Sequence, residues 1–282
     1  MKFSHPEADI YVPDNGAPEA ALARTTHLCI AAHQDDIEIM AYHGIAECFG
    51  RPDKRFGGVV VTNGAGSPRA GVYADYTDAT MQAVRRREQR KAALVGDYSI
   101  QLQLAHPSSA VKDPGNAAVQ ADLAAILALA SPAVVYLHQP ADKHDTHIAV
   151  LSHTIRALRA MPASRRPKKV LGCEVWRDLD WLGDNEKQAL DVGSYPNLAA
   201  SLVGVFDSQI TGGKRYDLAT AGRRLANATY AASHSTDKYQ AVTWAMDLTP
   251  LVADPKLSVP EFTRAAIARF QDDVATRLAK FF

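Results

Sequence analysis

The sequence predicts an α/β fold in which helices cover both faces of a mostly parallel β-sheet. Three apolar runs have the length and composition of strands that are buried on both faces: residues 28–32 (LCIAA), 56–61 (FGGVVV) and 133–137 (AVVYL). Each run is followed by a segment with helical periodicity, and this alternation is typical of a parallel sheet. We therefore expect a Rossmann-like arrangement of strands and helices.

The first 160 residues give the clearest pattern. Residues 1–24 contain three prolines and no clear period, which predicts an extended N-terminal arm on the surface. The strand at 28–32 turns directly into a helix, because Ile37, Met40 and Ala41 recur at helical spacing. The elements expected next are the strand at 56–61, a polar loop over 64–78, a helix from Thr80 to about Val95, a strand at 98–102 near an edge, a helix over 117–130, the strand at 133–137 and a helix over 144–160.

The pattern weakens beyond Trp176. A strand is expected at 170–176, and the apolar run at 202–206 suggests another. Apolar spacing predicts helices at 216–232 and 259–282. No repeat, low-complexity tract or linker separates these segments. We therefore expect a single domain over residues 1–282, with a less regular C-terminal extension over 180–282.

Composition limits the classes of function. Lysine plus arginine (31) equals aspartate plus glutamate (31), so the basic face of a nucleic-acid-binding protein is not expected. Cys29, Cys48 and Cys173 fit neither a zinc knuckle nor a disulfide framework, and so sparse a set suits a reducing compartment. No stretch approaches the length of a membrane span. We expect a cytoplasmic protein that acts on a small molecule, as a monomer or a homo-oligomer.

Polar residues are concentrated where the first strand ends. His33, Gln34, Asp35 and Asp36 follow it directly, at the end of the strand where ligands bind in open α/β sheets. Two carboxylates and an imidazole are costly to bury together unless a cation compensates them. From this turn alone, capping of the next helix by Asp35 or Asp36 explains the residues as well as metal binding does.

A second polar turn follows the strand at 133–137. It contains Asp142, His144, Asp145 and His147 and leads into a helix. His144 and His147 are three residues apart, so they share a face of the first helical turn. Because this turn has the same structural context as the first, the two together favour one metal site.

The two turns resemble the signatures of the LmbE-like (PIG-L) zinc-dependent de-N-acetylases, a His-Pro-Asp-Asp turn and a later His-x-Asp-His turn. The resemblance covers about residues 25–180 and includes Thr62-Asn63-Gly64, the run from Arg85 to Glu88 and Glu174-Val175-Trp176. It implies one zinc ion per chain, held by His33, Asp36 and His147. It also implies Asp35 as general base and His144 as the acid or oxyanion partner.

Three positions depart from the family pattern. Gln34 replaces the usual proline, and Ile37 stands where the family has glutamate, with Glu38 one place later. Thr146 occupies the aspartate position beside the last ligand, where the family residue is thought to orient the neighbouring histidine. We therefore expect a weaker or retuned acid at His144.

Substrate contacts are less specific in the sequence. Arg69, in the loop after the second strand, is a candidate for binding hydroxyls or a phosphate. Tyr73, Tyr76 and Trp176 are candidates for a sugar-binding face and equally for packing. The charged run from Arg85 to Glu88 is expected to be a solvated helix face.

The leading functional hypothesis is a zinc hydrolase that removes an N-acyl group, most simply acetyl, from an amino sugar or its conjugate. A metal-dependent hydratase of an unsaturated dicarboxylate on the same scaffold is the second, and a non-catalytic metal- or glycan-binding protein is the third. The presence of Asp35 argues against the third, because a carboxylate that does not bind metal has a catalytic use there. His/Asp sites also accept divalent ions other than zinc.

Overall fold

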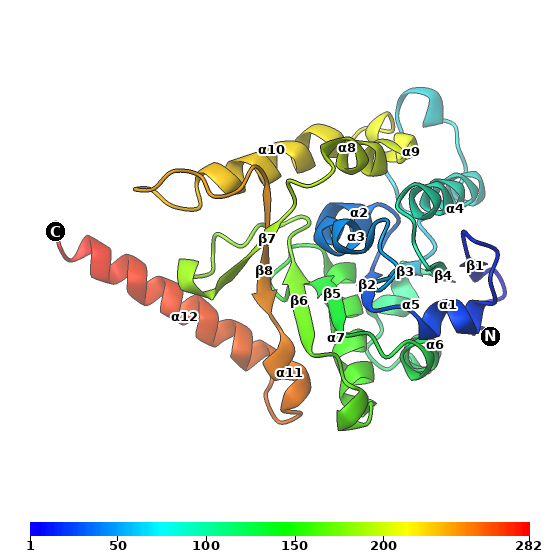
Figure 1. Ribbon diagram of the computed structural model, residues 1–282, viewed down its shortest axis with the longest axis horizontal. Coiled ribbons are helices and arrows are strands. Elements are labelled where there is room, and N and C mark those ends of the chain that lie inside the picture. Colours follow the sequence, from blue (N-terminus) through cyan, green and yellow to red (C-terminus); the bar gives the residue numbers. More distant parts are fainter.

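The computed structural model describes residues 1–282 as an eight-stranded sheet with helices on both faces (Figure 1). The strand order is β1-β4-β3-β2-β5-β6-β8-β7. The five strands from β4 to β6 in this order are parallel, whereas β1 and β8 pair antiparallel with their neighbours. The predicted α/β fold with a mostly parallel sheet is confirmed. The strands are β1 Asp9–Tyr11, β2 His27–Ala31, β3 Phe56–Thr62, β4 Ile100–His106, β5 Val134–His138, β6 Lys169–Cys173, β7 Lys187–Asp191 and β8 Val242–Asp247.

Twelve α-helices connect or cover these strands. They are α1 Pro18–Ala23, α2 Asp36–Met40, α3 Tyr42–Cys48, α4 Asp78–Val95, α5 Ser108–Lys112, α6 Ala117–Leu129, α7 Asp145–Ala160, α8 Pro196–Gly204, α9 Asp207–Ile210, α10 Tyr216–Thr229, α11 Thr249–Ala253 and α12 Val259–Leu278. No helix contains a stretch both apolar and long enough to span a bilayer.

The central strand β2 places alternate side chains in two separate cores. Leu28 and Ile30 face a core formed with α1, α6, α7 and α11, and Cys29 and Ala31 face one formed with α2, α3, α4 and α8. All five residues of β2 are buried, as expected for a strand covered on both faces. This sandwich fixes the carboxyl ends of β2 and β5 side by side, where the polar turns begin.

Two predicted segments differ from the structure. Residues 1–24 are not an extended arm: β1 pairs with β4, and α1 buries Leu22 completely in the first core. The apolar run at 202–206 is not a strand, because residues 196–204 form α8, with Pro196 in its first turn. Leu202 and Val203 are the buried residues of this helix, and the buried Phe206 precedes α9.

Candidate metal centre and active site

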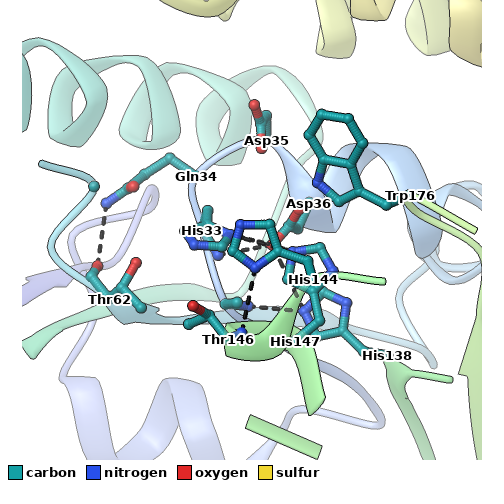
Figure 2. A network of polar contacts seen from close by, with 12 residues as sticks. His33, Gln34, Asp35, Asp36, Thr62, His138, His144, Thr146, His147 and Trp176 are labelled. Carbon is teal, nitrogen blue, oxygen red and sulfur yellow. Dashed lines mark hydrogen bonds and ion pairs between the residues drawn. The ribbon is translucent and has the colours of Figure 1, made fainter. Parts of the chain in front are cut away.

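The two polar turns meet at the carboxyl edge of the sheet. Residues 33–36 follow β2, residues 139–147 follow β5, and these two strands are parallel neighbours. Figure 2 shows His33, Asp36, His144 and His147 close together, with Asp35 to one side and Trp176 flanking the group. The expectation that both turns contribute to one place therefore agrees with the geometry.

Three donor atoms form a nearly equilateral triangle. His33 Nδ1 lies 3.2 Å from Asp36 Oδ2 and 3.2 Å from His147 Nε2, and His147 Nε2 lies 3.4 Å from Asp36 Oδ2. Zinc bonds of ~2.0–2.1 Å in tetrahedral geometry separate the ligand atoms by about 3.3 Å. The spacing therefore fits one face of a zinc coordination tetrahedron, with the fourth position left to the cavity.

The protonation of these residues suits a cation. Burial lowers the pKa of His33 to about 4, so its imidazole is neutral at pH 7 and has a free lone pair. Burial alone would raise the pKa of Asp36, but the neighbouring His147 and His33 hold it well below its usual range, so the carboxylate is ionised. Asp142 accepts a hydrogen bond from His147 Nδ1 at 3.1 Å, which leaves Nε2 facing the other two donors.

A second group of potential donors lies deeper. His138, Asp142 and His147 are also close enough to hold an ion, and the His138 ring stacks on His147 with centroids 3.8 Å apart. His138 Nε2, however, already accepts the backbone N–H of Ala32 at 3.0 Å. None of these three side chains lines the cavity, whereas His33 and Asp36 do. The first group is therefore the one accessible to substrate.

Capping does not explain the two aspartates. Asp35 occupies the N-cap position of α2, but its side chain accepts no hydrogen bond from the helix. Asp36 Oδ2 accepts the N–H of His33, which precedes the helix, at 2.7 Å. Asp35 has a φ of +95°, in the left-handed region that costs a non-glycine residue free energy and is common at functional sites.

Asp35 is buried beside a cation. Burial raises the pKa of its carboxyl group well above the usual value, and Arg85 opposes this rise. Arg85 Nη2 lies 3.7 Å from Asp35 Oδ2 and donates to the carbonyl of Gln34 at 2.6 Å, while Nη1 donates to Ser67 Oγ at 2.6 Å. The expectation of a fully solvated Arg85–Glu88 run is therefore wrong: Arg85 and Glu88 are buried, because both fall on the inward face of α4.

His144 is held by the backbone of its own helix. As the N-cap of α7, its Nδ1 accepts the N–H of Thr146 at 3.3 Å, which puts the proton of the neutral ring on Nε2. Burial lowers its pKa, so the neutral form prevails at pH 7. His144 thus presents an Nε2–H donor. The backbone N–H of Thr146 supports the orientation of its ring, a task that the resemblance gives to a carboxylate at position 146.

The other two departures from the family pattern lie away from the donor triangle. Gln34 is buried and donates to Gln103 Oε1 at 3.1 Å. Glu38 is buried and accepts hydrogen bonds from Tyr98 and Gln89, both at 2.8 Å, and burial raises its pKa to about 8. Ile37 instead packs in the second core. The shifted acid therefore belongs to a network beneath the site.

A cavity of about 370 Å³ opens beside the triangle. Its polar lining combines the predicted His33, Asp35, Asp36 and His144 with Arg85 and Thr146, which the sequence analysis named for other reasons. The polar residues that the sequence did not indicate are Ser67, Ser108, Lys112, Gln209, Lys214 and Tyr216. Of the aromatic candidates for a sugar-binding face, only Trp176 lines it.

Arg69 does not reach this cavity. Its guanidinium donates to the carbonyl of Ala65 at 2.8 Å and pairs with Asp78. Tyr73 also faces elsewhere, with its hydroxyl 2.6 Å from Asp207 Oδ2. The cations that do line the cavity are Arg85, Lys112 and Lys214.

Comparison with known protein families identifies one match. Residues 28–158 match the family model described as PIG-L, GlcNAc-PI de-N-acetylase. No curated protein sequence matches the chain.

Several solved structures share the fold. The 4-carboxy-2-hydroxymuconate hydratase from Pseudomonas putida has a TM-score of 0.57 at 16% identity, over 79% of this chain and 96% of its own. A conserved protein from Thermus thermophilus has a TM-score of 0.58 at 15% identity, over 83% and 99%. The N,N'-diacetylchitobiose deacetylase from Pyrococcus horikoshii has a TM-score of 0.59 at 15% identity, over 78% and 83%. Residues 28–158 of this chain are therefore a PIG-L (LmbE-like) domain.

Proposed function

We propose that the protein is a zinc-dependent hydrolase that removes an N-acyl group, most simply acetyl, from an amino sugar or its conjugate. The observation that carries the proposal is the triangle of His33, Asp36 and His147, open to a cavity that also contains the non-ligating carboxylate of Asp35. Three protein ligands with one free position are the pattern of a catalytic zinc site. The description of the matching family, a de-N-acetylase, supports the same chemistry.

The donor set fits zinc in atom type and spacing. His33, Asp36 and His147 would hold the ion, and Asp142 would orient His147. Zinc in such a site lowers the pKa of water to ~7 and polarises a carbonyl group.

The protein residues supply proton transfer and charge stabilisation. Asp35 lines the cavity without belonging to the donor triangle, so it is available to accept a proton from the attacking water. Arg85 opposes the rise in the pKa of Asp35 that burial causes, and it fixes the backbone of the turn through Gln34. His144, on the cavity wall, is placed to donate a hydrogen bond from Nε2–H to the oxygen that becomes negative. The proton that Asp35 accepts from the water then passes to the nitrogen, so that the amine departs neutral as the carbon–nitrogen bond breaks.

Metal analysis and two variants test this proposal. The purified protein should contain or take up about one zinc ion per chain, and His147→Ala should lose it. Asp35→Asn should retain zinc and lose hydrolysis of N-acetylated amino sugars by ~100-fold or more, because general-base catalysis contributes 10²–10⁴-fold. Binding without turnover in the parent protein, unchanged by Asp35→Asn, would instead indicate the non-catalytic metal- or glycan-binding protein.

A hydratase of an unsaturated dicarboxylate is the second candidate. The observation that favours it is the set of Arg85, Lys112 and Lys214 around the cavity, since a dicarboxylate requires more than one cation. Hydration also requires no protonation of an amine. Parallel assays of water addition to an unsaturated dicarboxylate and of acetate release from N-acetylglucosamine separate the two reactions.

A further inference from the structure

The wall of the cavity carries more positive than negative charge. Lys112 is the last residue of α5, Lys214 lies between α9 and α10, and Arg85 projects from α4, so three separate elements contribute cations. The only carboxylates in the lining are Asp35 and Asp36. Three cations against two carboxylates leave one net positive charge, and a bound divalent ion would raise it to three.

The three cations do not have equal freedom. Arg85 is buried and makes hydrogen bonds to Gln34, Gly64 and Ser67, so its guanidinium is occupied by the protein. Lys112 and Lys214 are exposed, and neither forms an ion pair. Lys214 Nζ lies over the Trp176 ring, 5.2 Å from its centroid, and this cation–π contact keeps the ammonium at the cavity wall.

We propose that Lys112 and Lys214 bind an anionic group, a carboxylate or a phosphate, that the substrate carries away from its acyl group. This inference rests on the proposed function, from which it takes the position of the acyl group in the cavity. The acyl carbonyl belongs beside His33, Asp36 and His144, where two aspartates would repel a second negative charge. The lysines provide positive charge elsewhere in the same cavity.

Matched amino sugars test the proposal with the zinc-loaded protein. The neutral sugar is methyl N-acetylglucosaminide, and the anionic sugars are N-acetylglucosamine 1-phosphate and N-acetylmuramic acid, which carry a phosphate and a carboxylate. Lys112→Met and Lys214→Met should each raise KM for the preferred anionic sugar about tenfold, as expected for one charge-assisted contact, and leave KM for the neutral sugar unchanged. Lys214→Arg should retain most of the affinity, and comparison of the two anionic sugars identifies the preferred group.

Lys91→Met is the control variant. Lys91 is an exposed lysine of α4 that lies outside the cavity lining, so its replacement removes the same charge from the chain without touching the site. Equal KM values for anionic and neutral sugars in the parent protein would overturn the proposal. An effect of Lys91→Met as large as that of the cavity lysines would also overturn it.

Binding measurements separate this proposal from the proposed reaction. If no sugar is hydrolysed, calorimetric titration with N-acetylglucosamine 1-phosphate and N-acetylmuramic acid still reports recognition of the anion. Binding that is weakened in Lys112→Met and Lys214→Met and by added salt would support anion recognition while the hydrolase proposal fails. If neither anionic sugar binds more tightly than the neutral sugar, the proposed recognition of an anion is overturned.

Discussion

Asp142 has a positioning role that the sequence pattern alone did not reveal. Its Oδ2 accepts a hydrogen bond from His147 Nδ1 at 3.1 Å, and its Oδ1 accepts the N–H of His144 at 3.3 Å. The buried carboxylate of Asp142 thus orients the ring of His147, a candidate metal donor, and the backbone of His144, the candidate acid or oxyanion partner. The contact also raises the basicity of His147: burial lowers its pKa, but Asp36 and Asp142 more than offset this.

We expect Asp142→Asn to weaken zinc binding by about 10–100-fold, the usual effect of removing a carboxylate that supports a metal-binding histidine. An amide cannot supply the charge, and its N–H group favours the wrong tautomer of His147. Competition with a chelator of known affinity measures the change. Asp145→Asn removes the same charge from an exposed position of the same turn and should have little effect. Equal affinities in Asp142→Asn and the parent protein would contradict this role.

The two polar turns could be recognised in the sequence because each comes after an apolar strand, whereas the choice of His33, Asp36 and His147 as donors came from the resemblance to the LmbE-like family. Arg85 could not be placed from its charged neighbours, since a local run of charge does not say which side of a helix faces inward. The helical period carries that information: Met81, Arg85, Glu88 and Ala92 share the buried face of α4. Lys112 and Lys214 gave no local signal, because only the tertiary fold brings α5 and the segment before α10 to one cavity.

At the scale of elements, the turn after β3 depends on one glycine. Gly64 has a φ of +75°, and a Cβ atom there would lie 2.4 Å from Gln34 Oε1 and 3.1 Å from Arg85 Cδ. Gly64 also accepts a hydrogen bond from Arg85 through its carbonyl oxygen. The turn at Gly64 therefore packs against Gln34 of the first polar turn and against Arg85, the arginine beside Asp35.

We expect Gly64→Ala to lower the free energy of unfolding by about 1–3 kcal/mol, because it combines an unfavourable φ with a steric clash. The same change should reduce kcat, since Gln34 and Arg85 must move. Chemical denaturation and steady-state kinetics measure the two effects. Gly66 is the matched control in the same loop: a Cβ atom there meets nothing within 4 Å, so Gly66→Ala should change stability by less than about 0.5 kcal/mol. Similar stabilities of the two variants would show that the turn tolerates a side chain.

β2, β3 and β5 were predictable because each is a continuous apolar run that the sheet buries. Short elements were not: β1 has three residues and α1 six, too few for a period to be recognised. The 202–206 run was ambiguous for a related reason, since five apolar residues suit a strand or a buried helix equally. Only the structure shows that the run begins within a helix, α8.

At the scale of the whole molecule, the candidate metal donors come from one part of the chain, whereas the cavity wall is completed by a second part. His33, Asp36 and His147 lie within the PIG-L domain at residues 28–158, whereas Trp176, Gln209, Lys214 and Tyr216 lie beyond it. The later segments are fastened to the domain by buried polar contacts. Glu88 accepts both the N–H and the hydroxyl of Ser208, at 2.8 and 2.6 Å, and Arg224 donates to the carbonyl of Glu38 at 2.8 Å.

This division predicts that substrate binding and metal binding respond to different substitutions. Tyr216, the first residue of α10, lines the cavity and packs edge-on against Trp176, with ring centroids 6.0 Å apart. We expect Tyr216→Ala to raise KM about tenfold through the loss of aromatic contact area, while zinc affinity stays unchanged. Steady-state kinetics and chelator competition on the same preparation measure both quantities.

Tyr230→Ala is the control for Tyr216→Ala, because Tyr230 follows the same helix but is 84% exposed. It should alter neither KM nor zinc affinity. If Tyr216→Ala also released zinc, the segments beyond residue 158 would be needed to hold the donor triangle together, and substrate recognition could not vary independently of the metal centre. If zinc affinity is retained, Tyr216 contributes to substrate binding alone, together with the wall residues from within 28–158 such as Lys112.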